Sequence, residues 1–209
     1  MENIVYKYFD LLEDQKNTIE LMYDVYSFWN KKVNLISRKD MDYFHERHLL
    51  HSLSICKFFN FLNNTKIMDL GTGGGFPGVP LAIMFPNIHF TLVDSITKKT
   101  QALSAIIKEL KLHNVTVLNS RAENVNNVFD FVVCRAVAKM YLLNKWTAKN
   151  ISSKHNHSFR NGLICLKGGD LKQELVQVNS IDSIVVHSIS DCFKEDFFVE
   201  KKIIHLFQD

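Results

Sequence analysis

The sequence predicts an α/β protein built on a doubly wound, mostly parallel sheet, with a helical N-terminal extension and a C-terminal antiparallel strand pair. Three observations lead to this fold class. Short apolar runs alternate with helical segments from residue 65 onward, as in parallel sheets whose strands are joined by helices. The first apolar run ends in a cluster of glycines, whereas residues 1–60 contain neither Gly nor Pro. We therefore divide the chain into a helical region, residues 1–64, and a ligand-binding core, residues 65–209.

The N-terminal region is expected to be helical because its apolar residues follow a helical period. They recur at three- and four-residue spacing, at Ile19, Met22, Tyr23, Tyr26 and Trp29. Asp40 or Asp42 is expected to cap a further helix that runs to about Phe59, because a short acidic side chain can accept a hydrogen bond from a free helical N–H.

The core is expected to alternate strands and helices. Strands are predicted at Ile67–Leu70, His89–Val93, Val115–Leu118, Phe129–Cys134 and Gly162–Leu166. Helices are predicted at Val79–Met84, Lys98–Leu110 and Ala136–Ala148. Two later apolar runs, Ser183–Ile189 and Phe197–Phe207, predict the closing antiparallel pair, and the polar stretch Ser152–Arg160 predicts a loop.

The composition is that of an ordinary globular protein and excludes several classes. The 209 residues are 46% hydrophobic and 22% charged, with a net charge of +3, which permits a nucleic-acid partner without requiring one. The four cysteines form no C-x-x-C pair, so we expect reduced thiols in a cytoplasmic protein. No apolar run reaches the roughly 18 residues that a membrane span needs, and no secretory leader pattern is present.

The glycine cluster is typical of a ligand-binding turn. Gly71, Gly73, Gly74 and Gly75 follow a predicted strand and precede a predicted helix, and only glycine lets a ligand approach the backbone this closely. Asp94 ends the next predicted strand, at the distance where an acidic side chain accepts hydrogen bonds from ribose hydroxyls. Capping of the following turn is the alternative role for this residue.

Two cofactor classes fit the turn. The segment 73–78 satisfies the dinucleotide pattern G-x-G-x-x-G, but Pro77 lacks the N–H that a pyrophosphate would need. The segment 68–75 instead reads apolar-Asp-apolar-Gly-x-Gly-x-Gly. Asp69 there can meet the cationic amino-acid end of S-adenosylmethionine and would repel a pyrophosphate. A methyl donor is therefore favoured over a dinucleotide, which would make the chain an oxidoreductase.

Longer segments resemble one family, the bacterial 16S rRNA guanine-N7 methyltransferases (RsmG/GidB). The matching segments, in family order over most of the chain, are 29–35, 47–53, 69–81, 93–95, 120–123, 135–138 and 166–168. The sequence Phe76-Pro77-Gly78 directly after the glycines is the most specific of them. The chain departs from the family pattern at His51, where the family usually has Asp, at Gly74, where it often has Pro or Ala, and at Arg38-Lys39-Asp40.

The resemblance implies a class I methyltransferase (Rossmann-like) fold and transfer of a methyl group from S-adenosylmethionine to N7 of one guanine. That guanine would be position 527 in the 530 loop of 16S rRNA, the partner would be the 30S subunit, and S-adenosylhomocysteine would be the product. The implied cofactor contacts are Gly71, Gly73, Phe76, Asp94, Ser95, Ala122, Glu123 and Arg135, although Arg135 could instead form a structural ion pair.

The chemistry implied requires few catalytic groups. Guanine N7 has an in-plane lone pair and no proton, so in-line displacement at the methyl group needs orientation and no general base. We therefore assign no catalytic residue and expect the RNA to be held by basic side chains. Residues 31–57 hold six Lys or Arg against three acids, and the RNA-facing candidates are Arg38, Arg47, His48 and Lys167.

Other classes of site and function are less favoured. His155 and His157 lack the further ligands that a metal site requires. For His45, His48 and His51, phosphate contact or packing is favoured over a metal face, so we expect no metal. A non-catalytic rRNA-binding assembly factor with the same fold is the remaining alternative to an enzyme. We expect a monomer.

Overall fold

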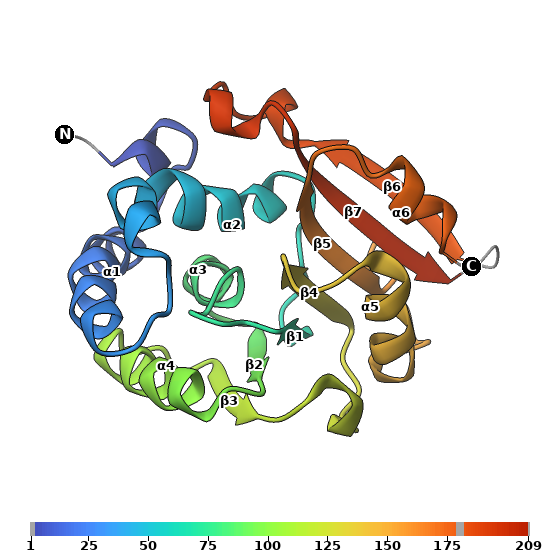
Figure 1. Cartoon of the computed structure of the whole chain (residues 1–209), viewed down its shortest axis with the longest axis horizontal. Helices are drawn as coiled ribbons and strands as arrows, with labels where there is room; N and C mark the ends of the chain where they lie inside the picture. The colour runs from blue at the N-terminus through green and yellow to red at the C-terminus, as the bar shows by residue number, and fades with distance from the viewer. Residues whose placement is uncertain (1–2, 179–181, 209) are drawn as a thin grey trace.

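A single mixed sheet forms the centre of the molecule in the computed structural model, which describes residues 3–178 and 182–208 (Figure 1). Its strands follow the order β3-β2-β1-β4-β5-β7-β6. The bounds are β1 Lys66–Leu70, β2 His89–Asp94, β3 Val115–Asn119, β4 Phe131–Arg135, β5 Gly162–Gly168, β6 Asp182–Ser188 and β7 Lys201–Gln208. Strands β1 to β5 pair in parallel, and β7 lies antiparallel to both β5 and β6. The predicted doubly wound sheet and its closing antiparallel pair are confirmed.

Two strands begin later than predicted. Strand β4 begins at Phe131 rather than Phe129, because Phe129 pairs only through an isolated bridge with Ile151. Strand β7 begins at Lys201 rather than Phe197, because residues 196–198 form a short 3₁₀ helix before it. Apolar residues lie just before both strands, at Phe129 and at Phe197 to Val199, so hydrophobicity alone did not locate these ends.

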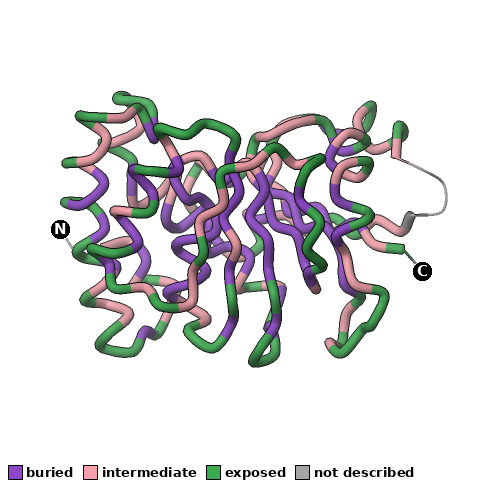
Figure 2. The backbone as a smooth tube through the Cα atoms, turned by 90° about the horizontal axis from the view of Figure 1, so that it is seen from below, coloured by how far each residue is buried: buried purple, intermediate pink, exposed green. Residues whose placement is uncertain are grey.

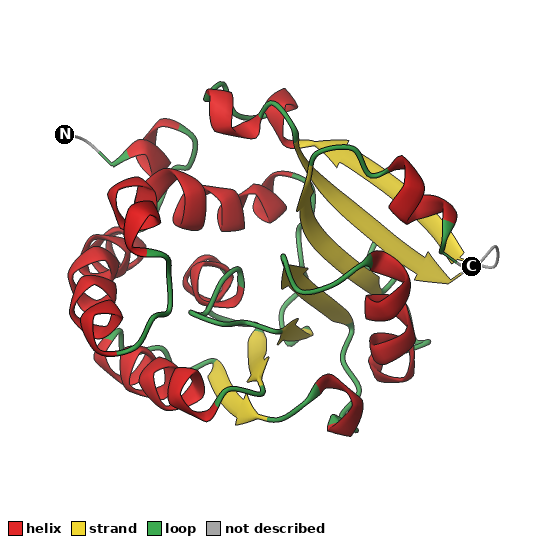
Figure 3. Ribbon diagram, viewed as in Figure 1, coloured by secondary structure: helices red, strands yellow, loops and turns green. Residues whose placement is uncertain are grey.

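Helices cover both faces of the sheet (Figures 1 and 3). Helices α1 (Glu13–Lys32), α2 (His51–Leu53), α3 (Gly78–Met84) and α4 (Thr97–Glu109) pack on one face, and α5 (Met140–Thr147) and α6 (Lys172–Val176) on the other. Alternate residues of β4 enter the two apolar clusters: Val133 the first, Val132 and Cys134 the second. The buried segments are concentrated in the interior, and exposed ones lie mostly at the surface and in the loops (Figure 2).

The predicted helix after residue 40 is a composite of short turns. A 3₁₀ segment Arg38–Tyr43 leads into a π-helical turn Phe44–Leu50, then α2 and a last 3₁₀ segment Ser54–Lys57. The expected cap at Asp40 or Asp42 is wrong: Ser37 caps the segment, and its hydroxyl accepts from the Asp40 N–H. The N-terminal helices share one apolar cluster with α3, α4 and the sheet, and a domain division after residue 64 stays a prediction.

The predicted helix Ala136–Ala148 begins late, at Met140. Ala136 has a φ of +54°, in the left-handed region that ends regular structure. Lys167 Nζ donates to the Ala138 carbonyl at 2.6 Å, and the Met140 N–H donates to Glu174, so partners distant in sequence set the start of the helix. The loop predicted at Ser152–Arg160 is confirmed.

Two of the compositional expectations can be compared with the structure. The four cysteines are free thiols, although the sulfur atoms of Cys134 and Cys165 lie 3.1 Å apart across β4 and β5. In the described part of the chain, every helix is too short or too polar to cross a membrane.

Candidate functional site

A hollow of about 330 Å³ opens at the carboxyl ends of β1, β2 and β4, next to the glycine turn. Parallel α/β sheets hold their ligands at this edge because the connecting loops diverge there. Its lining comprises Leu70, Gly71, Val93, Asp94, Ser95, Ile96, Ser120, Arg121, Ala122, Glu123, Ala136, Val137 and Trp146. We call it the turn hollow. Five of the predicted cofactor residues line it: Gly71, Asp94, Ser95, Ala122 and Glu123.

The turn needs glycine at its first position for two separate reasons. Gly71 has a φ of +64°, which L-residues with a Cβ adopt only under strain. A Cβ at this position would also lie 2.6 Å from a methyl carbon of Val137. Gly73 has a φ of +56°, but the space beside it is open, with no atom closer than 3.9 Å to a Cβ built there. The backbone at Gly73 is therefore accessible to a ligand.

Asp94 links the two loops that border the turn hollow. Its Oδ2 accepts from the Gly73 N–H at 2.9 Å, and its Oδ1 accepts from the Ile96 N–H at 2.8 Å. The alternative role, capping of the turn after β2, is thus present. A carboxylate offers about four lone-pair sites, so two remain for ligand hydroxyl groups. Ribose binding by Asp94 stays a prediction that these contacts leave open.

Asp69 lies beneath the turn rather than in the hollow. It is fully buried, and its Oδ2 accepts from the Thr72 hydroxyl at 2.6 Å and the Gly78 N–H at 2.8 Å. Burial raises the pKa of this carboxyl group to about 7, because desolvation penalises the charged form. The expectation that Asp69 meets the cationic end of a ligand is not supported by this placement. Its contacts hold the turn closed between β1 and α3.

Sequence reasoning missed part of the lining of the turn hollow. Ile96, Arg121, Val137 and Trp146 border it together with the predicted residues. Trp146 comes from α5, whose apolar face gave no sign that one side chain reaches a ligand site. Arg121 lies within segment 120–123, which resembles the family, and this resemblance was the feature of the sequence that could have identified it as a lining residue.

Gly73, Phe76 and Arg135 were also predicted to contact the cofactor, and all three lie outside the lining of the turn hollow. Phe76 is buried, and the Arg135 guanidinium lies 5.2 Å from the centre of its ring. Arg135 also donates to the Arg47 carbonyl at 3.0 Å and to His48 Nδ1 at 2.8 Å. Burial lowers the pKa of Arg135 to about 10, so it stays charged at neutral pH.

A second hollow, of about 390 Å³, adjoins the first. Its lining comprises Asp40, Arg47, His48, His51, Arg135, Ala136, Leu166, Lys167, Gly168, Phe197 and Lys201. We call it the basic hollow, since four of these side chains are Arg or Lys. Ala136 lines both hollows, so ligands in the two would meet at this residue.

Three of the four predicted RNA contacts line the basic hollow: Arg47, His48 and Lys167. Arg47 and His48 project from the π-helical turn, a distortion common at functional sites. The Arg47 guanidinium lies 3.7 Å from the centre of the Tyr43 ring and 3.3 Å from Asp40. The fourth predicted contact, Arg38, does not line the hollow and begins the preceding 3₁₀ segment.

His48 is neutral in the folded protein. Burial and the nearby Arg135 lower its pKa to about 4. Because arginine only donates, His48 Nδ1 accepts and the ring proton is assigned to Nε2, a buried atom with no partner in the described residues. His48 therefore carries an uncharged donor that is buried and has no partner in the described residues.

Lys167 is already paired. Its Nζ lies 2.7 Å from Glu174, which also accepts from the Met140 N–H, so α6 and α5 position this lysine. His51, the departure from the family pattern, is buried against Phe197 and Phe198. Burial holds the pKa of His51 well below its usual value.

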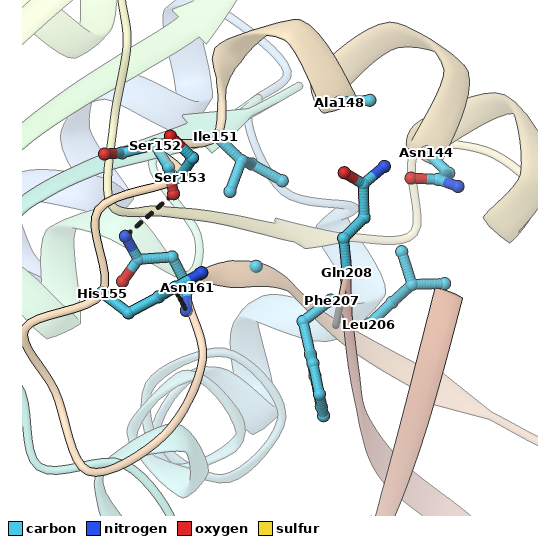
Figure 4. A pocket seen from close by; sticks show the side chains of 11 residues that line it. Asn144, Ala148, Ile151, Ser152, Ser153, His155, Asn161, Leu206, Phe207 and Gln208 are labelled. Carbon is cyan, nitrogen blue, oxygen red and sulfur yellow. Dashed lines mark hydrogen bonds between the residues drawn. The ribbon is translucent and has the colours of Figure 1, made fainter. Parts of the chain in front are cut away.

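A smaller pocket of about 150 Å³ lies elsewhere, at the start of β5 and the end of β7 (Figure 4). It includes His155, whose Nδ1 accepts from the Asn161 N–H. His157 lies 2.9 Å from the Thr65 hydroxyl, so both loop histidines have structural contacts. This pocket is at the amino end of β5, away from the sheet edge that binds ligands in such folds. Within the described residues no cluster of three or more His, Cys, Asp or Glu is arranged for a metal ion.

Comparison with known proteins identifies the family. The family described as rRNA small subunit methyltransferase G matches residues 15–195. The chain belongs to this family. A relative from Bacteroides thetaiotaomicron, named ribosomal RNA small subunit methyltransferase G, is 49% identical over 203 residues, which cover 97% of this chain and 98% of the relative. One from Phocaeicola vulgatus, with the same name, is 48% identical over 97% of each chain.

The fold is also found in solved structures of low sequence identity. MtNAS, solved in complex with S-adenosylmethionine, superposes with a TM-score of 0.61 at 12% identity, covering 93% of this chain and 76% of that one. Family and fold together confirm the predicted class, an S-adenosylmethionine-dependent methyltransferase with a Rossmann-like sheet. The oxidoreductase alternative is thereby set aside.

Proposed function

We propose that this methyltransferase transfers a methyl group from S-adenosylmethionine to N7 of guanine 527 in the 530 loop of 16S rRNA. The observation that carries the proposal is the pair of adjoining hollows: one beside a glycine turn with an acidic side chain, the other basic, with Ala136 common to both. The family name of the relatives supports small-subunit rRNA as the substrate.

The turn hollow fits S-adenosylmethionine. Asp94 would accept hydrogen bonds from the ribose hydroxyls, and the open backbone at Gly73 would lie beside the amino-acid part. Ile96 and Trp146 offer apolar surface for the adenine, next to Ala122 and Glu123. When bound, the cofactor supplies a methyl group on a cationic sulfur, which is already activated for displacement.

The basic hollow would hold the RNA and orient the target base. Arg47 and Lys201 are cations suited to phosphate, and His48 helps to position Arg135 through its Nδ1. N7 carries no proton, so the chain needs to supply alignment rather than a general base. Sequence-specific RNA recognition commonly uses bases that are turned out of the stack, which suits a recessed site.

The test is methylation of 30S subunits isolated from a strain that lacks this methyl group. With purified protein and S-adenosylmethionine, borohydride and aniline treatment followed by primer extension should reveal a strand break at position 527. An Asp94→Ala protein should give little modification at the same enzyme concentration. Subunits that remain unmodified with the wild-type protein would refute the proposal, whereas RNA binding without S-adenosylhomocysteine binding would favour the assembly factor.

A further inference from the structure

Asp40 is an acidic residue in a hollow whose other charged residues are Arg and Lys. Among the described residues that line this hollow it is the single acid, and the lining also holds Arg47, Arg135, Lys167 and Lys201. A surface that only attracted phosphate would bind it more strongly without a negative charge. The hollow therefore contains a feature that phosphate binding does not explain.

The carboxylate of Asp40 is held in place and ionised. The Ser37 hydroxyl donates to its Oδ2 at 2.7 Å, and Arg47 Nη1 donates to its Oδ1 at 3.3 Å. The Ser37 hydrogen bond, with help from the cations nearby, holds the pKa of Asp40 below its usual value. Two of about four lone-pair sites are used, so the carboxylate can accept two further hydrogen bonds.

The chemistry of a purine places its other edge opposite the reacting atom. In guanine, N7 and O6 lie on one edge, and the donors N1–H and N2–H₂ lie on the other. If N7 is directed to Ala136, where the two hollows meet, the donors are directed away from the turn hollow and into the basic hollow. Adenine has an unprotonated N1 there and no N2 amino group, so it offers no matching donors.

We propose that Asp40 reads the target base: its carboxylate accepts hydrogen bonds from N1–H and N2–H₂ of guanine and so selects guanine over other purines. The inference rests on the proposed function, because it requires a guanine whose N7 faces the methyl donor. In this arrangement Asp40 binds the base, and the basic side chains of the hollow bind the RNA phosphates.

The test measures how fast the enzyme methylates different bases placed at the target position. 30S particles are reconstituted with 16S rRNA that carries guanosine, inosine or adenosine at the target position, and kcat/KM for methyl transfer is measured. Inosine keeps N7, O6 and N1–H and lacks only the N2 amino group. For the wild-type enzyme, guanosine should exceed inosine by about tenfold and adenosine by up to about a hundredfold. For Asp40→Ala, the ratio of guanosine to inosine should fall close to one.

The ratio of kcat/KM between guanosine and the other two bases distinguishes recognition of the base by Asp40 from a structural role of this residue. If Asp40 served only to hold Arg47, its loss would lower all three substrates alike and leave the ratios unchanged, which would overturn the inference. Asp40→Asn, which retains one acceptor oxygen, is the second variant in case Asp40→Ala folds poorly, and it should reduce the ratio partially. Asp42→Ala, at an exposed acid outside the hollow, is the matched control and should keep wild-type ratios. Particles with guanosine that stay unmethylated by the wild-type enzyme would refute the proposed function itself.

Discussion

Replacing Gly71 by alanine should destabilise the protein by two separable effects. The φ of +64° costs an alanine about 1–2 kcal/mol, because its Cβ crowds the backbone in the left-handed region. The new Cβ would also lie 2.6 Å from Val137 Cγ2, and overpacking of this kind typically costs about 1–3 kcal/mol. The expected loss in free energy of unfolding is therefore about 2–5 kcal/mol.

The second effect can be removed without the first. In the double variant Gly71→Ala/Val137→Ala the crowded methyl groups are absent, so about 1–3 kcal/mol should be recovered while the backbone strain remains. Gly169→Ala is the control for backbone strain alone, because Gly169 has a φ of +76° and no atom within 4 Å of a Cβ. It should cost about 1–2 kcal/mol.

Urea unfolding of the four proteins measures these differences, and calorimetric titration with S-adenosylhomocysteine shows whether the turn still binds its ligand. Gly71 and Val137 both line the turn hollow. The double variant should therefore bind S-adenosylhomocysteine more weakly than the wild-type protein, even where its stability recovers. A Gly71→Ala protein no less stable than Gly169→Ala, or a double variant no more stable than the single one, would show that the contact with Val137 does not matter.

Three further outcomes are expected. Asp94→Ala removes a charged acceptor and should weaken S-adenosylhomocysteine binding about 10- to 100-fold by calorimetry, through loss of about 1.5–3 kcal/mol. Arg47→Ala should leave that binding unchanged and weaken RNA binding with a flatter salt dependence, as measured by filter binding at several salt concentrations; equal cofactor losses in both variants would contradict this division. Burial lowers the pKa of His48 and His205 to about 4 and holds that of His51 well below its usual value. The unfolded chain therefore binds more protons than the folded one, and stability should fall as pH drops from about 6.5 toward 4. Asp69, with a pKa of about 7, has the opposite effect, but it is one group against three histidines. Greater stability at pH 5 than at pH 7 in urea unfolding would refute the predicted pH dependence.

The sheet and the glycine turn were predictable because their signals are local. Apolar runs of strand length predict strands, and a glycine cluster at a strand end predicts a tight turn. The segment before α5 shows the limit of such signals: Ala136 has a positive φ, and Ala138 and Met140 are bound by Lys167 and Glu174, which approach from β5 and α6. No pattern within residues 136–148 contains that information.

The site was predictable in outline and less so in detail. The residues of the turn hollow lie at strand ends, which a sequence can locate. The clustering of Phe76, Arg135 and His48 depends on contact between the N-terminal helices and the sheet, and this contact joins residues 87 or 88 positions apart. Such pairings come from tertiary packing, so the sequence could nominate these residues but could not show that Arg135, assigned to the cofactor, lines the same hollow as His48.

The basic hollow combines the beginning of the chain with its end. Arg47 and His48 come from the first quarter, whereas Phe197 and Lys201 come from the last residues before and within β7. During translation the first part leaves the ribosome long before the last, and the hollow cannot exist until β7 has joined the sheet beside β5. A nascent chain thus carries the first of these basic residues without the recess that they line, and the hollow is completed only after Lys201 has been synthesised and β7 has formed.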